Sequence, residues 1–183
     1  MVDARPYSEG RTARVLVAVP VVALLAIVAG YVAMVAGQGG PGPSDVLTVP
    51  FVAAYLLLMA AILALSVIER PTIKSLRPAL RAAASAGLVA LGILAGFSIG
   101  PAIMIAAAFA IAAAVLSMVS APRRATYIGA AIGAVLSIGF LAFGLEVVWN
   151  IIICPPTGQS SGTTATGVNY DCDDGYLTVH YSQ

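Results

Sequence analysis

One carboxyl group interrupts the last long apolar run of the sequence. Glu146 is followed four positions later by Asn150, and residues four apart lie on one face of a helix. An ionisable side chain at membrane depth is costly and usually faces a bundle interior or a water-filled cavity. The pair is therefore a candidate proton or cation site. The simpler interpretation is that Glu146 hydrogen-bonds across helices, or that the hydrophobic stretch ends near Leu145.

The remaining residues with chemical potential lie near the C-terminus. Cys154 and Cys172 are the two cysteines, and we predict a disulfide between them because extracytoplasmic compartments are oxidising. The segment 169–174 carries one Asn and three Asp, but a calcium loop of the EF-hand type needs Gly at its sixth position and Glu at its twelfth. Gly175 is seventh from Asn169 and no such Glu follows. We therefore predict a solvated acidic turn and no metal site.

Recognisable catalytic sets are scarce. Walker-type loops, H-E-x-x-H and C-x-x-C motifs do not occur, and His180 is the one histidine. Two cysteines with one histidine are too few for a structural zinc site. We predict no catalytic residues, no cofactor and no enzymatic activity.

Composition identifies the solvent of most of the chain. Of 183 residues, 60% are hydrophobic and 9% are charged, whereas soluble domains carry roughly 25% charged residues. A soluble domain of this size could not cover so much apolar surface. This balance excludes soluble enzymes and nucleic-acid binders and favours a lipid bilayer as the partner.

Uncharged runs of about 20 residues are long enough to cross a bilayer as helices. Their continuous apolar character excludes membrane barrel strands, which alternate apolar and polar residues. Gly100-Pro101 divides the uncharged stretch between Arg81 and Arg123 into two runs, although a re-entrant hairpin over 82–120 stays an alternative. We predict five spans, at 15–37, 46–68, 82–99, 102–120 and 125–153.

The cationic side chains are confined to three segments. All nine Lys and Arg lie in 1–14, in 70–81 or at 123–124. The positive-inside rule then places the N-terminal segment 1–14 in the cytoplasm and the tail 154–183 outside the cell membrane. Arg77 and Arg81 share a helix face and are expected to join a basic rim facing anionic lipid headgroups. A cleaved signal peptide is the alternative for the first run, which is longer than the roughly 7–15 residues of a signal core.

Glycines recur at four-residue spacing in two of the predicted spans. Such small residues let membrane helices approach closely. The spacing fits a dimer face or packing within one chain, and the second interpretation is favoured because it suits the tight turn at Gly100-Pro101. The glycines concerned are Gly92, Gly96, Gly100, Gly129 and Gly133.

The tail has a weaker pattern. Residues 157–166 are rich in Gly, Ser and Thr and indicate a loop. Asp173-Asp174-Gly175 is a good turn, and 176–181 alternates like a strand. A short β-hairpin supported by the disulfide is therefore compatible with the tail.

These features together predict an all-α integral membrane protein, a five-helix bundle with a small extracytoplasmic C-terminal tail. The expected role is that of a non-enzymatic accessory, assembly or structural component of a bacterial membrane. Its partner would be another membrane protein or a second copy. The alternative is a small transporter or ion-conducting subunit that uses Glu146; a sensor with an outer input surface ranks below both.

Overall fold

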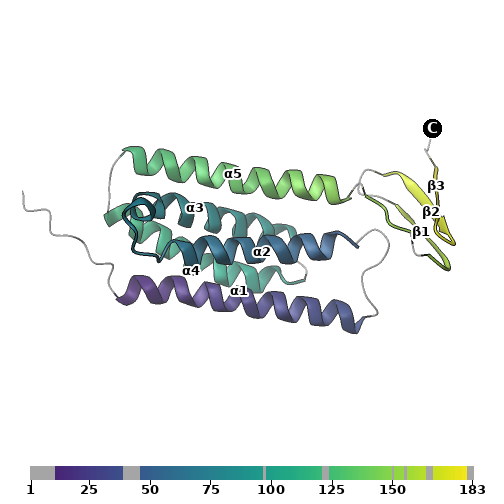
Figure 1. Cartoon of the computed structure of the whole chain (residues 1–183), viewed down its shortest axis with the longest axis horizontal. Helices are drawn as coiled ribbons and strands as arrows, with labels where there is room; N and C mark the ends of the chain where they lie inside the picture. The colour runs from purple at the N-terminus through teal and green to yellow at the C-terminus, as the bar shows by residue number, and fades with distance from the viewer. Residues whose placement is uncertain are drawn as a thin grey trace, which may run out of the picture. The chain divides into compact units, whose positions relative to one another are not determined.

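The computed structural model describes residues 11–38, 46–96, 98–120, 124–149, 151–154, 156–163 and 167–180. Within these ranges lie five helices, each long and apolar enough to cross a membrane, and a C-terminal three-stranded antiparallel sheet (Figure 1). The predicted fold class is confirmed. The helices are α1 (Arg11–Gly37), α2 (Thr48–Leu65), α3 (Pro71–Leu94), α4 (Gly100–Ser120) and α5 (Arg124–Trp149).

The third helix differs most from its predicted span. It begins at Pro71, eleven residues before the expected start at Ala82, and it ends at Leu94. Proline suits the first helical position because its missing N–H has no intrahelical partner there, and Arg70 before it is extended, with ψ 140°, as a residue preceding proline prefers. The predicted span starts at the first uncharged residue, whereas the helix carries its charges within its first three turns.

The described chain forms two compact units. The first comprises residues 1–27 and 57–138, and the second comprises 28–56 and 139–183. In the first unit, α3 and α4 pack as a hairpin whose buried contacts are mainly alanines together with Leu88 and Ile103. Small side chains allow this close approach. Because lipid tails are as apolar as the helices, the hairpin is held by van der Waals packing rather than by the hydrophobic effect. In its most apolar stretch, 56% of α3 is buried, against 17% of α1.

In the second unit, the first half of α2 meets the last part of α5 through aromatic rings. Phe51 and Tyr55 on α2 each lie against Phe140 on α5, with ring centroids 6.5 and 6.2 Å apart. A Cβ placed on Gly144 would come within 2.3 Å of the Phe51 ring. Glycine at this position therefore makes room for the aromatic side chain.

The tail is a sheet in the order β1 (Gln159–Thr163), β2 (Asn169–Asp173) and β3 (Tyr176–His180). The predicted turn is confirmed: Asp174 and Gly175 join β2 to β3 with φ of 44° and 86°, the left-handed pair of a type I′ hairpin. The predicted loop over 157–166 is wrong in its middle, because 159–163 pairs with β2 as a third strand.

The third strand has a physical reason. Two strands alone are marginal in water, and a third increases the cooperativity of the sheet. Tyr170 is buried over Gly162, its cross-strand partner, where a Cβ would come within 2.6 Å of the tyrosine hydroxyl. The Gly/Ser-rich composition that suggested a loop therefore provides the space for an aromatic side chain from the neighbouring strand.

Candidate functional site

The most unusual feature of the helices is a pair of buried arginines. Arg77 and Arg81 lie one turn apart on α3, and they are 9% and 1% exposed. Charged side chains inside a membrane bundle are expensive unless they are hydrogen-bonded. The hydrogen-bond partners of the two arginines therefore show which segments pack against the buried face of α3.

Arg81 connects three helices. Its Nε donates to the hydroxyl of Ser66, just after α2, at 3.2 Å, and its Nη1 donates to the carbonyl of Ala113 on α4 at 3.3 Å. Ser66 in turn donates to the carbonyl of Leu63 at 2.7 Å. The planar guanidinium can reach both acceptors at once because its donors diverge in a fixed fork.

Arg77 binds the connection that follows α2. Its Nη2 donates to the carbonyl of Ile68 at 3.1 Å and lies 3.4 Å from the carbonyl of Val67. Both carbonyls lie beyond Leu65, the last residue of α2, where no helix supplies a donor for them. Arg77 therefore holds the connection between α2 and α3 against α3 itself.

The expected basic rim is thus wrong for Arg77 and Arg81. They face the interior of the first unit rather than lipid headgroups. A signal was present in the sequence: Arg77, Arg81 and Ser85 recur every four residues, and all three are buried. The spacing of these polar residues in the sequence cannot show whether they face lipid headgroups or neighbouring helices.

An exposed ion pair lies in the same unit. Arg14, near the start of α1, pairs with Glu69 in the connection between α2 and α3. Exposed pairs typically contribute little stability. This contact nevertheless joins α1 to the segment whose carbonyls Arg77 binds.

Glu146, the favoured candidate for chemistry, lies in the last turn of α5 and is exposed. The helix ends at Trp149, so Glu146 is one turn from its end rather than deep in the bundle. The candidate membrane span of α5 continues to Trp149, and the proton or cation site at Glu146 stays a prediction. Asn150 lies outside the described residues.

The glycines divide according to their neighbours. A Cβ on Gly92 would meet the Met104 sulfur of α4 at 2.8 Å, and one on Gly100 would meet the carbonyl of Gly92 at 2.5 Å. Both serve the α3–α4 hairpin, whereas a Cβ on Gly96 would meet only backbone of its own turn, with the carbonyl of Ile93 at 3.1 Å.

On α5, a Cβ on Gly133 would lie 2.7 Å from the carbonyl of Ala79 on α3, and Gly129 lies near the same alanine. The close approaches at Gly92, Gly100 and Gly133 are therefore between helices of one chain, and Gly129 makes an ordinary van der Waals contact with α3.

The turn between α3 and α4 holds a motif that runs against the expectation of no catalytic set. Residues 96–100 read G-F-S-I-G, the spacing of a hydrolase nucleophile elbow, which requires a strand before the serine and a helix after it. Here a helix precedes Ser98, and its hydroxyl donates to the carbonyl of Ala95 at 3.3 Å. The motif therefore lacks the structural context of a nucleophile.

An apolar groove of about 610 Å³ lies between α3 and α5, with α4 contributing two residues. Alanine is the commonest residue of its lining, and exposed isoleucines and Tyr127 border it. Such a volume is typical of a small-molecule or lipid site. Its lining is Ala82, Ser85, Ala86, Val89, Ala90, Ile93, Ile111, Met118, Tyr127, Ala130, Ala131, Ala134 and Ile138.

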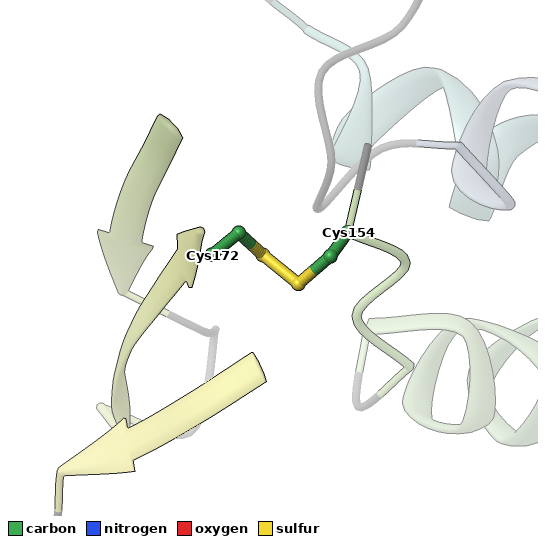
Figure 2. The surroundings of a disulfide bond; sticks show 2 residues. All are labelled: Cys154 and Cys172. Atoms are coloured by element: carbon green, nitrogen blue, oxygen red, sulfur yellow. A yellow bond between two sulfur atoms is a disulfide. The ribbon is translucent and has the colours of Figure 1, made fainter. Parts of the chain in front are cut away.

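In the tail, Cys154 and Cys172 form the predicted disulfide, which joins the segment after α5 to β2 (Figure 2). Cys172 is buried against the sheet. The bridge closes a loop that contains β1, and it therefore tethers the sheet to the segment that follows α5.

The polar side chains of 169–174 support the sheet. Asn169 accepts from Thr163, Asp173 from Gln159, and the Asp174 carboxylate from the backbone N–H of Gly158. Asp171 lies 3.1 Å from His180 on β3. Within the described ranges, no three His, Cys, Asp or Glu side chains gather to hold a metal ion.

Arg77 and Arg81 thus connect α3 to neighbouring segments of the chain, and the polar side chains of the tail connect its strands. Comparison with protein-family models, with curated proteins and with solved structures finds no match to this chain.

Proposed function

We propose that this chain is a non-enzymatic accessory component of a membrane assembly, which binds a membrane protein partner through its C-terminal sheet. The observation that carries the proposal is the exposure of large side chains on β3. Tyr176 is 80% exposed and Leu177 is 44% exposed. Adjacent strand residues point to opposite faces, so β3 offers an apolar contact on each side.

The position of β3 in the sheet strengthens this proposal. It is an edge strand, since β2 is its one neighbour in the sheet order. An edge strand presents backbone N–H and C=O groups that a partner strand can pair with, and tyrosine is enriched at the centres of protein interfaces. The disulfide would hold this surface next to the membrane.

The proposal includes the orientation, with the N-terminus in the cytoplasm and the sheet outside the cell membrane. Its support is the distribution of Lys and Arg together with the disulfide, because disulfides persist in oxidising compartments. Labelling of intact cells tests it: a tag after residue 183 should be accessible and a tag before residue 1 should not.

The partner is tested by a photo-crosslinking residue at position 176 in native membranes, with position 161 on β1 as the control in the same sheet. We expect a discrete protein adduct from 176, lost when Leu177→Ser is added, and none from 161. Equal adducts from both positions, or lipid adducts alone from 176, would refute recognition by β3.

A further inference from the structure

The groove between α3 and α5 has a length that matches half a bilayer. On α5 its lining runs from Tyr127 to Ile138, a rise of about 16 Å at about 1.5 Å per residue. On α3 it runs over the same number of residues, from Ala82 to Ile93. The hydrocarbon core is about 30 Å thick, so the groove covers about one leaflet.

That length favours an acyl chain over a partner helix. A spanning helix would need a groove that continues over both leaflets, whereas one lipid chain fills one leaflet. The alanines of the lining, such as Ala86, Ala90 and Ala134, leave a smooth channel that a flexible chain can contact along its length. Ile93 and Ile111 at its border are exposed, so a chain could enter from the surrounding lipid.

One end of the groove carries a positive charge. Arg124 begins α5, three residues before Tyr127, and it is exposed. Residues three apart lie on the same helix face, so Arg124 continues the groove face toward the membrane surface. The first N–H groups of α5 lie at the same end, and helix N-termini favour phosphate. Basic sites between membrane helices bind anionic lipid headgroups in this way.

We infer that this groove is a binding site for one anionic phospholipid, with an acyl chain along the alanines of α3 and α5 and the phosphate beside Arg124. The site uses neither the C-terminal sheet nor Glu146. It is therefore independent of the proposed partner recognition.

The test is lipid titration of the full chain in detergent, followed by native mass spectrometry. The probes are phosphatidylglycerol and phosphatidylcholine with identical acyl chains. We expect one phosphatidylglycerol to bind in preference to phosphatidylcholine. Arg124→Gln should weaken phosphatidylglycerol binding about fivefold, the factor that corresponds to about 1 kcal/mol for one interfacial charge, and leave phosphatidylcholine binding unchanged.

Ala131→Phe fills the groove from an exposed lining position and should weaken the binding of both lipids. Two controls match these changes. Arg70→Gln removes an exposed charge twelve residues before Ala82, the first α3 residue of the lining. Val135→Phe enlarges an exposed residue of α5 outside the lining. Both controls should bind like the unchanged chain. Circular dichroism and thermal melting of each variant establish that it folds. If Ala131→Phe does not fold, Arg124→Gln and the comparison of the two lipids still test the inference.

Three results would overturn the inference. Equal binding of the two lipids would remove the headgroup preference, and equal losses from the control variants would show general attraction to the surface. A photo-crosslinker at position 131 that captures a second copy or another protein, rather than a lipid, would assign the groove to a protein partner.

Discussion

Replacing Arg81 shows whether this residue is a buried clamp, which joins α3 to Ser66 and to α4 by hydrogen bonds, or part of a lipid-facing rim. Arg81→Met removes the donors to Ser66 and Ala113 but leaves no charge behind, and Ser66 still donates to Leu63. Side-chain hydrogen bonds between membrane helices average about 0.6 kcal/mol each and reach about 1.7 kcal/mol. We therefore expect Arg81→Met to lower the free energy of unfolding by about 1–3 kcal/mol.

Arg81→Lys should be more damaging than Arg81→Met. Lysine keeps the buried charge, but its ammonium lacks the fork that reaches both acceptors, and a poorly compensated buried charge costs about 3–5 kcal/mol. On a hydrated rim the order would be reversed, since lysine would then substitute well for arginine.

The assay is unfolding in mixed micelles with increasing denaturing detergent, followed by circular dichroism. A double-mutant cycle with Ser66→Ala should give a coupling of about 0.6–1.7 kcal/mol. Arg70→Met is the control, because Arg70 is an exposed arginine just before α3. Its free energy of unfolding should stay within about 0.5 kcal/mol of that of the unchanged chain. If Arg81→Lys is as stable as the unchanged chain, the clamp is refuted.

Three further predictions follow from contacts in the helices and the tail. Gly133→Ala forces a Cβ to 2.7 Å from the Ala79 carbonyl and should destabilise the bundle by about 1–3 kcal/mol in the same unfolding assay, whereas Gly139→Ala, with no neighbour within 4 Å, should not. Cys172→Ser should destabilise the sheet by about 3 kcal/mol in the chain-entropy model, measured as faster chymotrypsin cleavage of the tail with unchanged helical content; unchanged cleavage would contradict it. Glu146→Gln should leave ion flux into liposomes as it is in the unchanged chain, since Glu146 is exposed at the end of α5; a flux lost in the variant would revive the transport alternative.

Features that depend on solvent and on local geometry were predictable from the amino-acid sequence. Continuous apolar runs of membrane length have one way to satisfy their backbone groups, so the five helices were predictable. The Asp174-Gly175 turn was predictable for a similar reason, because few residue pairs adopt two successive positive φ values. The disulfide followed from two cysteines in a tail expected outside the cell.

The tertiary structure decided which groups meet. Arg77 and Arg81 carry the same charge whether they face lipid headgroups or backbone carbonyls. Only the packing of α4 and of the connection after α2 against α3 shows that they are buried. Likewise, residues 159–163 look like a loop until Tyr170 lies over Gly162. In both cases the stabilising partner belongs to another element, and the composition of one segment does not show which element packs against it.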